Sequence, residues 1–360
     1  MRTTVFRRSR ALRVALELTT VGFLGTVSFA ERTSAQQNRQ NQNRGQQDQA
    51  RGQQNQNFDN VEVQVLPVQG NVYMLVGAGG NITLQVGDEG VLLVDTQFAQ
   101  LSDKILAAIR KLSTKPIRYI INTHVHPDHI GGNEKIAKAG STIAGGNVVG
   151  TIGASASQGA TVIAHENVLN RMSAPTGQQA PMPAGAWPTD TFFTAEKEVF
   201  FNGEAIQILH QPAAHTDGDS LVFFRRSDVV STGDIFVTTG YPMIDTQRGG
   251  TIQGIVDGLN RILDLTIPRE KQEGGTMVIP GHGRLCDEAD VVEYRDMVTI
   301  IRDRIQDMVK KSMTLAQVKA ARPTLDYDAR YGATTGSWTT DMFVEAVYRD
   351  LSQGQVSQKR

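Results

Sequence analysis

Apolar residues along the chain follow two different periods, which alternate in a regular order. Between residues 61 and 96 the runs VEVQVLP, VYMLVG, ITLQV and VLLVDT are short, and glycine turns such as GAGGN and GDEG separate them. This pattern predicts strands joined as antiparallel hairpins. The next stretch, SDKILAAIRKL, has apolar residues at helical spacing and predicts a helix with Ser102 or Asp103 as its N-cap.

The same order of strands and helices returns in the second half of the chain. A strand PIRYIIN, a pair of helical segments from residue 131 onward and a strand TVIAH lead to residues 170–190, which are rich in Pro, Gly, Met and Ala and predict a long loop. The strands EKEVFF, AIQILHQP, DSLVFFRR and SDVVSTGD follow, then a helix over TIQGIVDGLNRILDL, a strand TMVIP, and helices over 287–311, 313–322 and 339–352. This repeated arrangement predicts the α+β class, as a four-layer αββα sandwich of two packed sheets with helices outside each.

Two N-terminal segments lie outside this pattern. Residues 1–35 carry arginines at positions 2, 7, 8, 10 and 13, then the apolar run VGFLGTVSFA and two small residues, Ser34 and Ala35. This is the layout of a signal peptide, and the apolar run is shorter than the roughly 20 residues of a membrane span. We therefore expect an exported protein, periplasmic or secreted, without stable membrane insertion after signal removal. Residues 36–57 are rich in Gln and Asn, with almost no apolar side chain, and predict a disordered linker.

Charge and cysteine content narrow the classes of partner. Removing residues 1–35 takes six arginines and two glutamates from totals of 36 basic and 37 acidic residues, which leaves 30 against 35. A chain without a basic excess is not expected to bind nucleic acid, so a small-molecule substrate is favoured. Because Cys286 is the single cysteine, no internal disulfide can form, and the apolar core must stabilise the exported chain.

Three of the seven histidines lie within six residues, in the segment NTHVHPDHIGGN after a predicted strand. Imidazole and carboxylate ligands suit zinc first, with iron and manganese as alternatives. A bend at Pro127 would direct alternate side chains toward two ions about 3.5–4 Å apart. Further ligand types follow other predicted strands, each beside glycine. The candidate metal ligands are His124, His126, Asp128, His129, His215, Asp234 and His282.

Over roughly residues 60–290, this ordered set of motifs resembles that of metallo-β-lactamase-fold hydrolases. The resemblance implies that His124, His126 and His215 hold one divalent ion, that Asp128, His129 and His282 hold a second, and that Asp234 bridges them. It also implies that Asp95 supports the histidine loop through hydrogen bonds and is not itself a ligand. The expected domains are a catalytic domain at 58–290 and a helical extension at 291–360 packed on it.

The activity implied is hydrolysis by a metal-bound hydroxide, because two divalent ions sharing a water lower its pKa from 15.7 toward about 7. Asp128 is the candidate for proton transfer. In one subclass of the family's β-lactamases, a cysteine stands at the position of Asp234, and a lysine three residues later anchors the lactam carboxylate. Here that later residue is Val237. The scissile bond is therefore left open among ester, thioester, lactone and lactam.

Three alternatives remain beside a general metal hydrolase. They are a β-lactamase proper, an oxidoreductase similar to the mononuclear-iron persulfide dioxygenases, and a non-catalytic exported metal-binding module. His165, His210 and Tyr241 could each approach the site, although a structural role is favoured for all three. Residues 170–190 could form a substrate lid. The oligomeric state is left open, because Trp338 and Phe343 could face either the domain or a second subunit.

Overall fold

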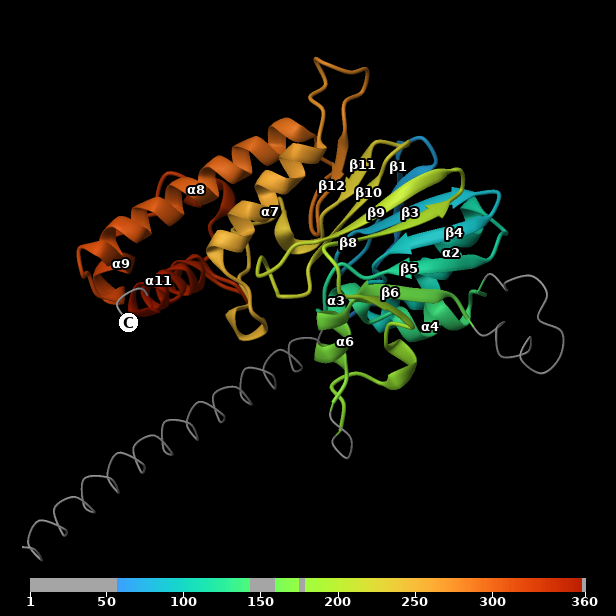
Figure 1. Cartoon of the computed structure of the whole chain (residues 1–360), viewed down its shortest axis with the longest axis horizontal. Helices are drawn as coiled ribbons and strands as arrows, with labels where there is room; N and C mark the ends of the chain where they lie inside the picture. Colours follow the sequence, from blue (N-terminus) through green and yellow to red (C-terminus); the bar gives the residue numbers. More distant parts are fainter. Residues whose placement is uncertain (1–56, 143–158, 175–178, 358–360) are drawn as a thin grey trace, which may run out of the picture. The chain divides into compact units, whose positions relative to one another are not determined.

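Two sheets pack face to face in the computed structural model, which describes residues 57–142, 159–174 and 179–357 (Figure 1). The first sheet contains β1 (Gln64–Gln69), β2 (Val72–Val76), β3 (Ile82–Gly87), β4 (Gly90–Val94), β5 (Ile117–Ile121), β6 (Thr161–His165) and β7 (Asp190–Phe192), in that order. Strands β1 to β4 pair antiparallel, as their glycine turns predict, and β4 to β7 pair parallel. The predicted signal peptide and nearly all of the predicted linker lie outside the described residues.

The second sheet is smaller and has five strands. Its order is β12 (Met277–Ile279), β11 (Val229–Ser231), β10 (Ser220–Phe224), β9 (Glu204–His210) and β8 (Glu196–Phe201). Strands β8 to β11 are antiparallel, whereas β11 and β12 are parallel. Apolar side chains of β2 and β4 pack between the sheets on those of β9 and β10. This inter-sheet core holds the two sheets in a fixed relation, so loops from both can contribute to one site.

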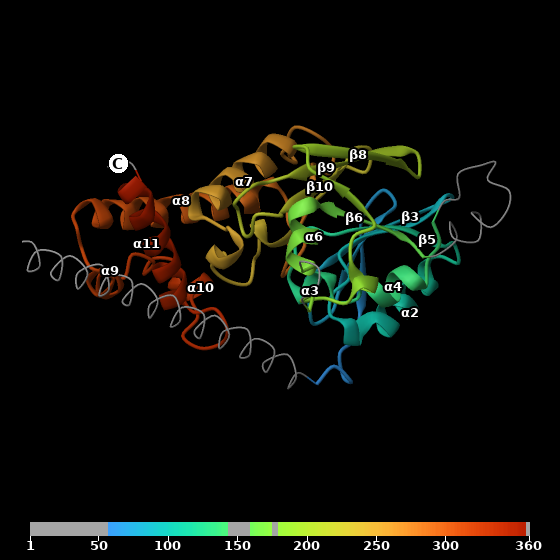
Figure 2. The same cartoon turned by 60° about the horizontal axis from the view of Figure 1, so that its bottom comes forward.

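Helices cover the outer faces of both sheets, which completes the predicted four-layer sandwich (Figure 2). On the first sheet these are η1 (Ala99–Leu101), α2 (Ser102–Leu112), α3 (Pro127–Ile130), α4 (Asn133–Lys138), α6 (Glu166–Met172) and η2 (Ala184–Ala186). With the second sheet belong η3 (Gly233–Ile235), η4 (Thr246–Arg248), α7 (Ile252–Leu265), α8 (Glu288–Lys310), α9 (Leu315–Ala321), α10 (Asp328–Tyr331) and α11 (Thr340–Ser357). The expected helix over SDKILAAIRKL is α2, and the one over TIQGIVDGLNRILDL is α7.

The predicted N-cap of α2 is wrong. The residue before the helix is Leu101, which already has helical backbone angles and no capping side chain. The hydroxyl of Ser102 donates backward to the carbonyl of Ala99 instead. The physical reason is that η1 runs directly into α2, so its backbone takes the place of a polar cap.

Residues 170–190 contain more structure than a long loop. Helix α6 extends to Met172, and η2 and β7 occupy part of the remainder. Met172 and Ala186 are buried against Ile130, and the Trp187 indole packs there and donates its Nε1 hydrogen to the Met182 carbonyl at 2.9 Å. The apolar side chains that made this segment a lid candidate thus pack against the core in its described part; residues 175–178 are outside that part.

Helices α7, α8 and α11 form one apolar layer beside the second sheet. Tyr294 of α8 meets Phe236 edge to face at 5.2 Å between ring centroids, and Phe343 is fully buried against Tyr241. Phe343 is therefore not available to a second subunit, and Trp338 is partly buried against the same layer. No helix among the described residues is long and apolar enough to cross a membrane.

Candidate metal centre

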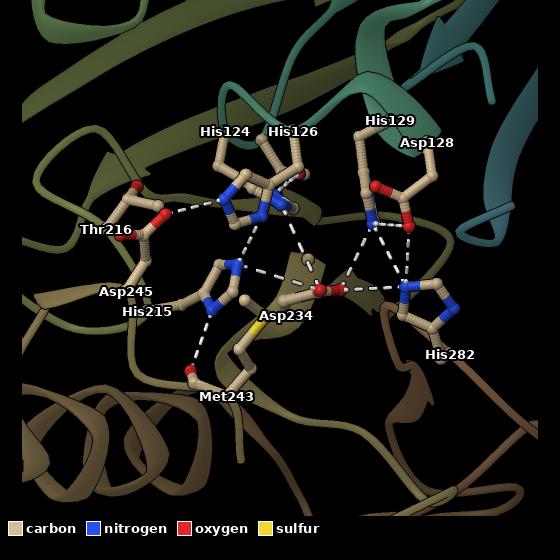
Figure 3. A network of polar contacts seen from close by, with 12 residues as sticks. His124, His126, Asp128, His129, His215, Thr216, Asp234, Met243, Asp245 and His282 are labelled. Atoms are coloured by element: carbon tan, nitrogen blue, oxygen red, sulfur yellow. Dashed lines mark hydrogen bonds and ion pairs between the residues drawn. The ribbon is translucent and has the colours of Figure 1, made fainter. Parts of the chain in front are cut away.

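All seven predicted ligand residues lie together where strands of both sheets end (Figure 3). The first group contains His124 after β5, His126 and, from the second sheet, His215. Nδ1 of His126 is 2.9 Å from Nε2 of His215. Oδ2 of Asp234 faces this group, at 3.7 Å from His215 Nε2 and 3.9 Å from His124 Nε2.

The second group uses the other oxygen of Asp234. Its Oδ1 lies 3.2 Å from Nε2 of His129 and 3.5 Å from Nε2 of His282. The two ring nitrogens are 3.3 Å apart, and Oδ2 of Asp128 is 3.3 Å from that of His282. One carboxylate therefore faces two separate groups of nitrogen and oxygen atoms, each of which could hold a metal ion.

The nitrogen and oxygen atoms of the two groups are better satisfied by divalent cations than by hydrogen bonds to one another. Nε2 of His124 is buried without a hydrogen-bond partner among the described residues, and the buried Oδ1 of Asp234 meets His129 and His282 only as ion pairs at 3.2 and 3.5 Å. A buried polar group without a partner costs about 1–3 kcal/mol. A cation in each group would satisfy both atoms, and neutral imidazole with carboxylate is a ligand set suited to zinc, iron or manganese.

Asp95 supports the histidine loop through the hydrogen bonds expected from the sequence. Its Oδ2 is 2.7 Å from Nδ1 of His129 and accepts the Thr123 hydroxyl hydrogen at 2.6 Å, while its Oδ1 accepts from the Thr123 backbone N–H at 2.8 Å. Thr123 Oγ1 in turn lies 3.0 Å from Nδ1 of His124. Asp95 has a φ of 66° and is fully enclosed, so a strained backbone position directs this carboxylate at His129 of the second group and, through Thr123, supports His124 of the first.

Two further side-chain and backbone groups support the histidines and are not predicted from the sequence. Oδ2 of Asp245 lies 2.9 Å from Nε2 of His126 and accepts from Arg248 at 2.5 Å. The backbone carbonyl of Met243 is 2.8 Å from Nδ1 of His215. Both residues lie in the segment YPMID, which has neither strand periodicity nor ligand spacing, so no sequence signal identifies them. Only the chain path between η3 and η4 brings them to the histidines.

A model of the metallo-β-lactamase superfamily matches residues 75–282, more than half of the chain and all seven ligand candidates. The chain belongs to the metallo-β-lactamase superfamily. The predicted family and αββα fold are thereby confirmed.

The chain is similar to individual alkylsulfatases and metallo-β-lactamases. A linear primary-alkylsulfatase of Pseudomonas sp. (strain ATCC 19151) is 27% identical over 252 residues, which cover 63% of this chain and 46% of that protein. The solved structure of a stereoselective inverting sec-alkylsulfatase, Pisa1 from Pseudomonas sp., shares the fold with a TM-score of 0.57 and 16% identity, over 83% of this chain and 52% of that one. A metallo-β-lactamase from Pontibacter korlensis aligns with a TM-score of 0.49 at 15% identity, over 66% of this chain and 99% of that one. The chain spans about half the length of the alkylsulfatases it matches.

The charges of aspartates and histidines in the centre offset one another even without an ion. Burial opposes ionisation of Asp128, yet the charges of His129 and His282 hold its pKa at about 2. Burial also works against protonation of His282, but Asp234 and Asp128 raise its pKa to about 9. In the first group, burial and the neighbouring His126 lower the pKa of His215 to about 4. The first group therefore offers His215 neutral and ready for an ion, whereas the second must release a proton from His282.

The remaining candidates have structural roles. Tyr241 donates its hydroxyl hydrogen to the carbonyl of Thr324 and to Asp328, at 3.2 and 3.0 Å, so this hydrogen is not free for an oxyanion. His165 precedes α6 and accepts from a backbone N–H of its first turn. Its ring stacks on His210 at 3.6 Å. The structural interpretation of all three side chains agrees with these contacts.

Replacing Asp95 by asparagine tests its support of both groups. Asp95→Asn keeps the shape of the side chain but removes the negative charge facing His129. We expect zinc affinity to fall about 10- to 100-fold, as for other carboxylates that orient a ligating histidine. Zinc titration against a competing chelating dye measures this change. An affinity equal to that of the unmodified protein would show that Asp95 only stabilises the loop.

Proposed function

We propose that the chain is a dinuclear metal-dependent hydrolase that cleaves a sulfate ester of an alkyl alcohol. The observation that carries the dinuclear site is the position of Asp234, whose two oxygens face two separate ligand groups. Zinc is the first choice of ion, with iron and manganese as alternatives. The proposal includes export to the periplasm or the medium, which rests on residues 1–35.

Bound divalent ions would supply Lewis acidity, which lowers the pKa of water and offsets negative charge that develops on the substrate. His124, His126 and His215 would hold one ion, and His129 and His282 would hold the other with Asp128. The Asp128 side chain is one-quarter exposed and its Oδ2 lies 3.3 Å from Nε2 of His282, so its carboxylate is placed to accept a proton from a water molecule at the second group. Water then adds across the ester, and the products are an alcohol and hydrogen sulfate.

The sulfate ester is favoured over a lactam by three observations. The 27% identical relative is named as an alkylsulfatase. Val237, at the place of the lysine that anchors a lactam carboxylate, is buried. Arginines beside the ligand loops are each paired with an aspartate, as Arg171, Arg248 and Arg284 are. These features favour a substrate whose anionic group is the reacting group itself, since such a group can be held by the ions alone.

Turnover of defined substrates by the zinc-loaded chain tests this proposal. We expect sulfate release from a linear alkyl sulfate with a kcat/KM at least about tenfold above that for a chromogenic cephalosporin, a margin of about 1.4 kcal/mol in transition-state binding. Asp128→Asn should lose this activity while the chain stays folded. If the chain hydrolyses the cephalosporin, a thioester or a lactone faster than the alkyl sulfate, that compound's class replaces the sulfate ester as the proposed substrate. Two bound ions without any turnover would contradict the hydrolase itself.

A further inference from the structure

Four of the five histidines in the centre are held through the ring nitrogen that faces away from their ligand group. The partners are a hydroxyl, two carboxylates and a backbone carbonyl. The pairs are His124 Nδ1 with Thr123 Oγ1, His126 Nε2 with Asp245 Oδ2, His129 Nδ1 with Asp95 Oδ2, and His215 Nδ1 with the Met243 carbonyl, at 2.7–3.0 Å. Such contacts fix the tautomer and the plane of a ligating ring.

His282 lacks this kind of contact. Its Nε2 faces Asp128 and Asp234, while Nδ1 has no partner among the described residues, and Figure 3 shows this nitrogen pointing away from the centre. The ring is also the most exposed of the five, with 28% of its side chain accessible. Its direction must therefore come from the backbone of the loop that carries it.

Asn81 holds that backbone on both sides of His282. Its side-chain amide donates to the carbonyls of Pro280 and Gly283, at 2.9 and 3.1 Å, and its backbone N–H donates to the carbonyl of Gly281 at 2.7 Å. Asn81 lies between β2 and β3 of the first sheet and is only 5% exposed. The first sheet thus fixes a loop that follows β12 of the second sheet.

The same turn contacts the other two residues of the second group. The backbone N–H of Gly80 donates to the carbonyl of Asp128 at 3.0 Å. Gly80 also packs so closely on His129 that a Cβ there would lie 2.2 Å from the ring. The turn at residues 77–81 therefore supports the second group, whereas Asp245 supports the first.

We propose that Asn81 is a positioning residue for His282 and sets the affinity of the second ion separately from that of the first. The inference rests on the proposed dinuclear function. Removing the amide frees the carbonyls of Pro280 and Gly283, so the loop on both sides of His282 loses its side-chain support and keeps only backbone hydrogen bonds, such as that from Thr238 to the His282 carbonyl at 3.0 Å. The first group keeps all of its own contacts, since none of them passes through Asn81.

Zinc titration of the folded chain, with zinc alone as the probe, tests this assignment. The variants are Asn81→Ala, without the amide, and Asn81→Ser, which retains one donor if the alanine variant does not fold. Asn71→Ala is the matched control. Its amide also donates to a carbonyl, that of Val86 at 2.9 Å, and it also reaches across to the second sheet, but at the opposite end of β2. Thermal unfolding of each ion-free variant is measured in parallel.

We expect two equivalents of zinc per unmodified chain. In Asn81→Ala the first should bind unchanged and the second about 10- to 100-fold more weakly, with a smaller loss in Asn81→Ser. Asn71→Ala should lower the unfolding temperature and leave both affinities unchanged. If Asn81→Ala weakens the binding of both ions equally, or weakens binding no more than the control does, the role of Asn81 is overturned while the dinuclear function stands. Fewer than two equivalents on the unmodified chain would overturn the dinuclear function, and this inference with it.

Discussion

Asp234→Ala is expected to eliminate tight binding of both ions and to lower kcat/KM by at least about 10³-fold. The reason is geometric, because Oδ2 and Oδ1 face different ligand groups and one substitution removes a ligand from each. The variant also leaves five closely placed histidines with one fewer carboxylate to offset their positive charge. Metal content after gel filtration and turnover of an alkyl sulfate measure the two effects.

A matched aspartate gives the control for this variant. Asp303 lies on α8, more than half exposed, and pairs with the neighbouring Arg302. Asp303→Ala should retain two ions and full turnover, because an exposed ion pair contributes little to stability. Retention of one tightly bound ion in Asp234→Ala would show that Asp234 serves one group only.

Gly281→Ala is the second substitution with a large expected effect. An alanine Cβ at this position would lie 2.1 Å from Oδ1 of Asp234 and 2.6 Å from the backbone of Gly233. The backbone cannot yield easily, because the N–H of Gly281 donates to the carbonyls of Gly233 and Phe236. The methyl group must displace Asp234. We expect a loss of about 1–3 kcal/mol in the free energy of unfolding. We also expect zinc affinity to fall at least about 100-fold, the upper end for a disturbed ligand environment.

Gly240→Ala separates this clash from the general cost of a methyl group. The nearest atom to a Cβ at Gly240 is the Tyr331 carbonyl oxygen, at an ordinary distance of 3.6 Å. Chemical denaturation and zinc titration of the two variants should therefore differ. If Gly281→Ala binds zinc as tightly as Gly240→Ala does, Asp234 is not held where the structure places it.

The chain's periodicity and ligand spacing predicted most of the architecture. Glycine turns identified the antiparallel strands β1 to β4, and the positions of His215, Asp234 and His282 after strands indicated that they meet at one edge. These features could be predicted because strand alternation and turn chemistry depend only on residues that are close together in the sequence. The resemblance of the ordered motifs supplied the pairing of ligands into two groups.

The supports of the centre could not be predicted in the same way. Asp245 and Asn81 act on histidines 119 and about 200 positions away in sequence, through contacts that exist only after the sheets have packed. Neither has a neighbouring motif, and each resembles an ordinary turn residue. The predicted N-cap of α2 was wrong for a related reason. The preceding η1 turn takes the place of a side-chain cap, and residues 99–101 have no strong helical pattern.

Anomalous diffraction from crystals of the zinc-loaded chain, recorded on both sides of the zinc absorption edge, shows directly how many zinc ions the centre holds and which residues coordinate them. We expect two zinc peaks per chain. One should be coordinated by His124, His126 and His215, the other by Asp128, His129 and His282, with Asp234 reaching both. A single peak, or a second peak away from Asp128, His129 and His282, would contradict a dinuclear hydrolytic centre.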